Sequence, residues 1–206
     1  MEQQLLIMLE MQDAMNARVH PQWRKQNFEW YRAIWVECAE LLDHYGWKWW
    51  KKQEPELDQV KLELVDIWHF GMSHLLAGEG DYASVARGLA PAFERFAAPG
   101  DFRVNLEAFA SDTLRHRRFD PLRFAPLLSD VALPFDELYQ RYIGKNVLNV
   151  FRQDHGYQEG SYRKTWAGRE DNEHLVELVA ELDSTQPEFK NLLYAGLVER
   201  YQRLKP

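Results

Sequence analysis

Two pairs of acidic residues, each three positions apart, interrupt otherwise apolar segments of the chain. Glu37 and Glu40 lie in VECAELLDHYG, and Glu63 and Asp66 lie in LELVDIWHF. Residues three apart are neighbours on the surface of a helix, so each pair would present its carboxylates side by side. No Lys or Arg stands three or four positions from Glu37 or Glu63, whereas a solvated charged face would be expected to carry such partners. The pattern favours four acids that share bound cations.

The helices that carry these pairs are expected to form an antiparallel hairpin. One is predicted over about residues 30–45, where Gly46 supplies a C-terminal stop, and the other over about residues 57–76. At the usual helical rise, Glu37 lies about 12 Å before the end of the first helix and Glu63 about 9 Å after the start of the second. The pairs would therefore face each other at similar depth. Converging hard oxygen ligands suit Mg²⁺ or Mn²⁺.

A zinc site fits the sequence less well. His69 and His74 are five positions apart, so they do not share one face of a helix, and Cys38 is the only cysteine. His69 is instead expected to be packed or hydrogen-bonded within its helix.

A stripe of polar and basic side chains lies farther along the chain. Lys145, Asn149 and Arg152 fall at i, i+4 and i+7, so they would share one face of a helix. Such a stripe can bind phosphate oxygens, although on its own it is equally typical of an ordinary surface. Segment 156–172 is polar and glycine-punctuated, but it matches neither a Walker loop nor a Rossmann fingerprint. Together with the acids, the stripe indicates a site for a metal-bound phosphate substrate.

The composition is that of a globular protein. Of the 206 residues, 46% are hydrophobic and 14% aromatic, which is enough for one sizeable core. The net charge of −7 argues against a nucleic-acid surface, and the single cysteine fits a reducing compartment. The first 21 residues lack a secretory signal, and no apolar run approaches the roughly 20 residues of a membrane span. These features predict a cytoplasmic protein that binds neither nucleic acid nor membrane.

Helical periodicity dominates the chain and predicts an all-α fold. No alternating β segment, repeat or low-complexity linker interrupts it, so residues 1–206 are expected to form a single helical-bundle domain. Breaks near 78–81 and 98–101 suggest that segment 79–135 is a cap on this domain. Beyond the hairpin, helices are expected in the N-terminal segment, over 82–98, over 104–118, after Pro134, from about Glu173 and after Pro187.

Five segments, taken in order, resemble the dimeric all-α dUTP diphosphatases of the MazG-like NTP pyrophosphohydrolase superfamily. The acid pairs alone are typical only of the superfamily, whereas KNVLNVFRQDHGY and YRKTWAGREDN are far more specific. The resemblance covers most of the chain but not about 79–135. Its segments are LEMQDAMN, VECAELLDHYGWKWWK, ELVDIWHF, GKNVLNVFRQDHGY and GSYRKTWAGREDN.

The resemblance implies an all-α homodimer with a mobile cap. It also implies Mg²⁺-dependent hydrolysis of dUTP to dUMP and pyrophosphate by attack at the β-phosphorus, which limits uracil in DNA and supplies dUMP. Two or more Mg²⁺ ions per site, replaceable by Mn²⁺, and dUDP as a second substrate are part of this expectation. The residues that match the family's metal ligands are Glu37, Glu40, Glu63 and Asp66, with Glu37 favoured for activating water.

The same resemblance assigns the two ends of the substrate. The phosphate contacts would be Lys145, Asn149, Arg152, Tyr162 and Lys164. The catalytic residues would be Glu37, Glu40, Lys145 and Arg152. The nucleoside contacts would be Gln12, Asn16, Trp50 and Asn172. Amide groups can both donate to and accept from uracil, although on spacing alone Gln12 and Asn16 would be ordinary residues of an exposed helix face.

Two other functions are compatible with parts of this pattern. A related all-α pyrophosphohydrolase could act on another nucleotide such as dCTP, because an amide can present either its donor or its acceptor to the base. A helical interaction protein without catalytic activity is the alternative from another class. The presence of all four acids and of both basic phosphate candidates argues against it.

Overall fold

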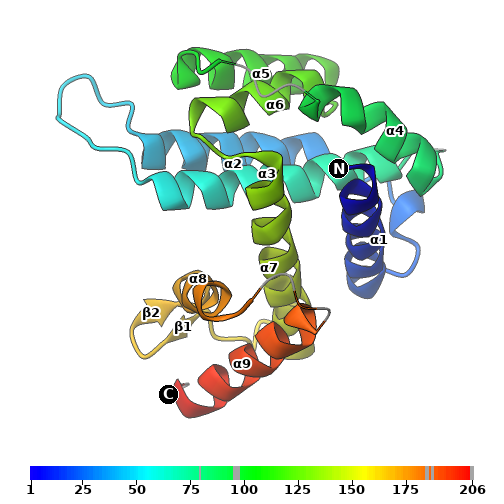
Figure 1. The fold of residues 1–206 in the computed structure, drawn as a ribbon, viewed down its shortest axis with the longest axis vertical. Helices are drawn as coiled ribbons and strands as arrows, with labels where there is room; N and C mark the ends of the chain where they lie inside the picture. The colour runs from blue at the N-terminus through cyan, green and yellow to red at the C-terminus, as the bar shows by residue number, and fades with distance from the viewer. Residues whose placement is uncertain (79, 95–97, 184–185, 187, 205–206) are drawn as a thin grey trace.

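The computed structural model describes residues 1–78, 80–94, 98–183, 186 and 188–204, which fold into α-helices and one short antiparallel ribbon (Figure 1). The ribbon pairs β1 (Thr165–Trp166) with β2 (Arg169–Glu170). A 3₁₀ turn, Trp23–Lys25, follows the first helix. The helices are α1 (Glu2–Val19), α2 (Trp30–Tyr45), α3 (Leu57–Leu76), α4 (Tyr82–Phe93), α5 (Phe102–His116), α6 (Pro121–Asp130), α7 (Phe135–Asp154), α8 (Asp171–Glu181) and α9 (Phe189–Leu204).

The α2–α3 hairpin is the central element of the fold. The two helices lie side by side and are joined by a projecting loop, residues 46–56 (Figure 1). The Glu56 N–H donates to the His44 carbonyl at 3.0 Å, which closes the hairpin at the loop end. This confirms both predicted helices, with their bounds, and their antiparallel arrangement.

Helix α7 connects two bodies of the molecule. At its start it packs near the hairpin and α1, and it then extends away to carry α8, α9 and the ribbon at its far end (Figure 1). Buried Tyr142 on α7 donates to the Met8 carbonyl of α1 at 2.9 Å, which fixes the first half of the helix. Farther along, Phe151 packs edge-on against Trp166 and Tyr201, so the C-terminal elements are anchored on the second half.

Residues of α4, of α6 and of the turn before α6 cover the hairpin through an aromatic cluster. Trp68 of α3 is fully buried and stacks on Phe124 of α6, with ring centroids 5.7 Å apart, while Phe93 and Phe119 meet it edge-on. Aromatic pairs add about 0.5–1.5 kcal/mol each beyond the area they bury. In this structure α4, α5 and α6 are therefore part of the packed body. The expected cap movement of segment 79–135 stays a prediction.

Several boundaries differ from the sequence expectations for identifiable local reasons. Helix α4 ends at Phe93 rather than near 98, and residues 95–97 lie outside the described part of the chain. Helix α6 was not expected, although its Asp120 cap and Pro121 at the first position are recognised start signals. The ribbon was also missed, because its strands are two residues long. Helix α8 begins slightly early, at a capping box formed by Glu170 and Glu173.

The helix predicted after Pro187 is present as α9. Helix α9 begins at Phe189, while Pro187 itself lies outside the described residues. Within the described ranges, no helix combines the length and apolar character that crossing a membrane requires.

Two glycines in helix interiors provide a matched test of the packing against α3. A Cβ at Gly71 would lie 2.8 Å from Phe119 ring atoms, whereas a Cβ at exposed Gly88 would meet nothing within 4 Å. We expect Gly71→Ala to lower the free energy of unfolding by about 1–3 kcal/mol, because the aromatic cluster must shift. Gly88→Ala should raise it by up to about 1 kcal/mol through helix propensity. Urea unfolding of both variants measures the difference, and equal stabilities would contradict the described packing.

Candidate active site

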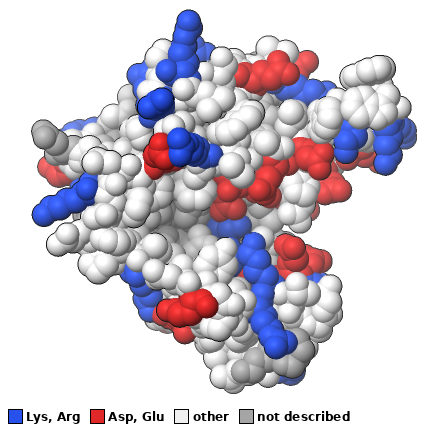
Figure 2. Space-filling model, turned by 180° about the vertical axis from the view of Figure 1, so that it is seen from behind, with Lys and Arg blue, Asp and Glu red and all other residues white. Residues whose placement is uncertain are grey.

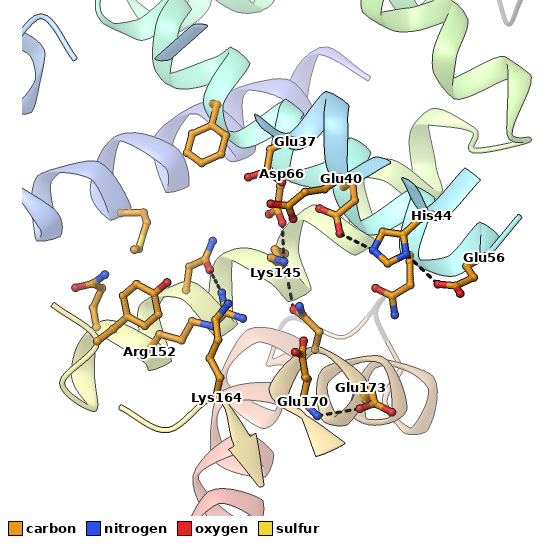
Figure 3. Close-up of a pocket in the computed structure, with 18 residues that line it drawn as sticks. Glu37, Glu40, His44, Glu56, Asp66, Lys145, Arg152, Lys164, Glu170 and Glu173 are labelled. Carbon is orange, nitrogen blue, oxygen red and sulfur yellow. Dashed lines mark hydrogen bonds and ion pairs between the residues drawn. The ribbon is translucent and has the colours of Figure 1, made fainter. Parts of the chain in front are cut away.

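A cavity of about 720 Å³ lies between the α2–α3 hairpin and the C-terminal elements. Its volume is in the range of nucleotide-sized ligand pockets. Figure 2 shows the recess, with acidic side chains along its upper edge and a basic group at its base. Figure 3 shows the lining: acids from α2 and α3 point in from one side, and Lys145, Arg152 and Lys164 approach from the other.

Three of the four predicted metal ligands converge on one point. Oxygen atoms of Glu37, Glu63 and Asp66 all lie within 4.8 Å of one another, and each side chain is half-buried. Glu40 lines the same cavity from one turn farther along α2, but it is exposed and stands outside this group. All four acids thus line the same cavity, but three are half-buried and close together, whereas Glu40 is exposed.

The electrostatics of this cluster favour a cation between the carboxylates. Burial raises the pKa of Glu37 to about 9, and the charges of Asp66, Glu63 and Glu40 and a hydrogen bond with Glu63 act in the same direction. Burial and the Asp66 charge likewise raise the pKa of Glu63. Acids that resist ionisation together can be ionised when a positive charge binds among them. The hard oxygen donor set fits a divalent cation such as Mg²⁺.

Lys145 connects the acidic wall to the C-terminal elements. Its Nζ lies 2.7 Å from Asp66 Oδ2 and donates to Asn172 Oδ1 at 3.2 Å, and its side chain is only 5% exposed. Asn172 is the second residue of α8 and also lines the cavity. A predicted phosphate contact and a predicted nucleoside contact are therefore hydrogen-bonded to each other next to a predicted metal ligand.

Arg152 is held at the cavity by a buried carboxylate. Its Nε and Nη2 each donate to Asp171 at 2.8 Å, and its Nη1 donates to Asn149 Oδ1 at 3.3 Å. Tyr162 donates its hydroxyl to the same carboxylate at 2.8 Å. Burial alone would raise the pKa of Asp171, but the hydrogen bonds and charge of Arg152 outweigh it and lower that pKa. Asn149, Arg152 and Lys164 line the cavity, whereas Tyr162 does not.

The amides of Gln12 and Asn16 lie behind the cavity lining in a buried network. Gln12 accepts from Tyr142 at 3.1 Å and donates to Asn16 at 3.0 Å, and Asn16 donates to Ser73 at 2.9 Å. Both amide side chains are more than 90% buried, so the expectation of an ordinary exposed face is wrong. Their neighbour Met15 is the α1 residue that lines the cavity. Their predicted role in binding the nucleoside stays a prediction.

Trp50 lies away from the cavity in this structure. It belongs to the projecting loop, is 57% exposed, and packs edge-on against Trp47 and Trp49. The side chain of Trp49 is 90% exposed. The predicted contact between Trp50 and the base stays a prediction.

His69 is packed as expected. It is buried, its Nδ1–H donates to the Val65 carbonyl at 2.8 Å, and burial lowers its pKa to about 4. The described residues that form a candidate metal cluster are the three carboxylates, so the site has the oxygen ligands of a hard cation rather than a zinc set.

Several lining residues were not identified from the sequence. His44 lies 2.9 Å from Glu56 and 3.8 Å from Glu63, and it stands four residues after Glu40, a helical spacing that could have identified it. Phe70 is four residues after Asp66 and, like Met15, adds an apolar side chain to the lining. The remaining lining residues that were missed are Glu56, Gln59, Gln153, Tyr157, Glu170 and Glu173.

An all-α frame that sets carboxylates opposite basic side chains across one cavity is typical of metal-assisted hydrolases of phosphate compounds. A family model described as dUTPase matches residues 4–157, 154 of the 206 in the chain. The chain therefore belongs to this all-α dUTPase family, and it is a hydrolase of dUTP. No curated protein sequence matches it. The match includes the acid pairs and Arg152, whereas Tyr162, Lys164 and Asn172 follow it.

The raised pKa of Glu37 makes the stability of the metal-free protein depend on pH. An acid whose pKa is higher in the folded than in the unfolded chain stabilises the fold below about pH 4.5, and this stability is lost as pH rises towards about 9. Glu37→Gln cannot ionise, so in EDTA it should be no less stable than the parent at pH 5 and more stable at pH 8.5. Unfolding in urea at both pH values measures the free energy of unfolding of each protein. If the parent becomes more stable relative to the variant between pH 5 and pH 8.5, the prediction is contradicted.

Proposed function

We propose that the protein hydrolyses dUTP to dUMP and pyrophosphate at this cavity, using a divalent cation bound by its carboxylates. The observation that carries the proposal is the convergence of Glu37, Glu63 and Asp66 in the same cavity that Lys145 and Arg152 enter from the opposite side. Family membership supports dUTP as the substrate. The geometry supports a site in which one wall binds metal and the other binds phosphate.

The acids would hold Mg²⁺, or Mn²⁺ in its place, and bound metal would supply charge neutralisation for the triphosphate and a lower pKa for the attacking water. Glu37, Glu63 and Asp66 provide the converging oxygens, and Glu40, which lines the same cavity, would add a ligand for a second ion. Glu37 would accept the proton of the water, as the family resemblance favours, because a carboxylate within reach of the attacking water can act as a general base.

The basic wall would bind the triphosphate and stabilise the reaction. Water attacks the β-phosphorus, its oxygen remains in pyrophosphate, and the bond from the β-phosphorus to the oxygen shared with the α-phosphate breaks, so that this oxygen leaves with dUMP. Lys145 and Arg152 stabilise charge that develops on the β- and γ-phosphate oxygens. Lys164 and Asn149 lie on the same lining and add contacts at the phosphate end.

The nucleoside would occupy the end of the cavity near Met15 and Phe70. These two side chains provide apolar contact for a base, and the amides of Gln12 and Asn16 lie directly behind Met15. To bind uracil, the amides must exchange their present partners for the base. This exchange would favour a base whose donors and acceptors match them, because a mismatched base leaves buried polar groups unpaired.

Release of pyrophosphate from dUTP, dCTP, dTTP and UTP tests this proposal. We expect the fastest release from dUTP, full inhibition by EDTA and recovery with Mg²⁺. Glu63→Gln and Asp66→Asn should each lower kcat by at least about 100-fold, since each removes charge from the metal site. Glu199→Gln, on the exposed side of α9, should leave kcat unchanged.

Two results would overturn the proposal. Full activity in EDTA would exclude the metal, and faster hydrolysis of dCTP than of dUTP would favour the alternative substrate. In ¹⁸O-labelled water the label should enter pyrophosphate. Label in dUMP would place the attack at the α-phosphorus instead.

We also propose that the protein is a homodimer. The resemblance to dimeric dUTP diphosphatases supports this, and so do large apolar side chains that remain exposed, among them Trp35, Val36 and Leu114. Light scattering at micromolar concentration should give twice the 24.4 kDa of one chain. A mass near 24.4 kDa would contradict the proposal.

A further inference from the structure

A three-residue group, which we call the Asp171 cluster (Arg152, Tyr162 and Asp171), lies just behind the phosphate end of the cavity. Asp171 is fully buried and Arg152 is 8% exposed. Both carboxylate oxygens accept from the guanidinium at 2.8 Å, and Oδ2 also accepts from the Tyr162 hydroxyl at 2.8 Å. Of the three residues, only Arg152 lines the cavity.

The bidentate bond determines which edge of the guanidinium faces the cavity. Asp171 occupies Nε and Nη2, and Nη1 is left near Asn149, a second lining residue. A planar guanidinium with two of its nitrogens fixed cannot rotate without breaking both bonds. Because the carboxylate is fully buried, water cannot readily replace it. The remaining donors of Arg152 are therefore held in one direction before any substrate binds.

The same cluster positions the start of α8. The Asp171 backbone N–H donates to the Lys164 carbonyl at 2.8 Å, and the next residue, Asn172, accepts from Lys145. Lys164 and Asn172 line the cavity. Asp171 thus bonds Arg152 through its side chain and Lys164 through its backbone, and it directly precedes Asn172 in the chain. All three of these neighbours line the cavity.

Stability alone does not account for such a group. A buried ion pair often contributes no more to folding than apolar residues of the same volume, since both charges must leave water. The cluster does fix the orientation of the Arg152 guanidinium, and the Asp171 carboxylate partly neutralises the charge of that guanidinium.

We propose that Asp171 is a positioning residue for phosphate binding, that it acts through Arg152, and that Tyr162 orients Asp171 instead of contacting phosphate. This inference rests on the proposed function, in which Arg152 binds the triphosphate. It gives Tyr162 a role different from the one that the family resemblance implies.

The variants Asp171→Asn and Tyr162→Phe test the proposal against a matched control. Arg200 donates from its Nη2 to both carboxylate oxygens of Glu181, at 2.8 and 3.0 Å, in the same C-terminal elements but away from the cavity lining. Glu181→Gln therefore removes a carboxylate from an arginine without affecting the cavity. We expect kcat/KM for dUTP to fall about 100-fold in Asp171→Asn, less in Tyr162→Phe, and not at all in Glu181→Gln.

Inhibition constants separate positioning from a general loss of structure. Pyrophosphate should inhibit Asp171→Asn about tenfold more weakly than the parent, because it depends on the Arg152 contact. Deoxyuridine, which has no phosphate, should inhibit both equally. Tyr162→Phe keeps every charge and should weaken inhibition by pyrophosphate by a smaller factor than Asp171→Asn does, while inhibition by deoxyuridine stays unchanged. An equal loss of affinity for both inhibitors in both variants would overturn the proposal.

A double variant tests whether Asp171 acts through Arg152. If it does, Arg152→Ala combined with Asp171→Asn should be no slower than Arg152→Ala alone. A further large decrease in the double variant would show an independent role and overturn the inference. If Arg152→Ala alone retains the parent rate, the assignment of Arg152 in the proposed function is wrong. If Arg152→Ala is slow while Asp171→Asn is not, only the present inference is wrong.

Discussion

Repulsion among half-buried carboxylates is the physical constraint on which the rest of the site depends. Glu37, Glu63 and Asp66 approach within 4.8 Å, although burial and their mutual charge make ionisation of all three costly. Helices α2 and α3 hold them there through apolar contacts on their opposite faces, where Ile34, Leu64 and Trp68 are fully buried. Apolar packing thus holds the three carboxylates together against their mutual repulsion. Bound cations would relieve that repulsion.

Helix α7 places the opposite charge. Its first half is anchored to α1 by Tyr142, and its second half carries the C-terminal elements through Phe151. Lys145 lies between these anchors, Arg152 directly follows the second one, and both residues line the cavity. A rigid helix fixed at both ends is a suitable frame for charges that must meet a triphosphate at defined distances. Ion pairs with Asp66 and Asp171, respectively, let Lys145 and Arg152 remain buried before substrate arrives.

The base end of the site has a different character. The apolar lining near Met15 and Phe70 adjoins a closed amide network in which Gln12 and Asn16 are bonded to other protein groups. The loop that carries Trp50 extends away from the cavity. The residues proposed to bind phosphate therefore meet within one chain, whereas the proposed contacts to the base would require these side chains to change partners or position.

The sequence by itself determined the hairpin, the acid pairs and the basic stripe, because helical spacing places i, i+3, i+4 and i+7 side chains on one face without knowledge of the fold. The all-α class and the family followed from the same motifs. Only the tertiary structure decided that Glu40 stands outside the converging acids, that Gln12 and Asn16 are buried, and that Asp171 holds Arg152. These facts depend on which helices meet and at what angle, and such contacts join residues far apart in the chain, for which local periodicity contains no information.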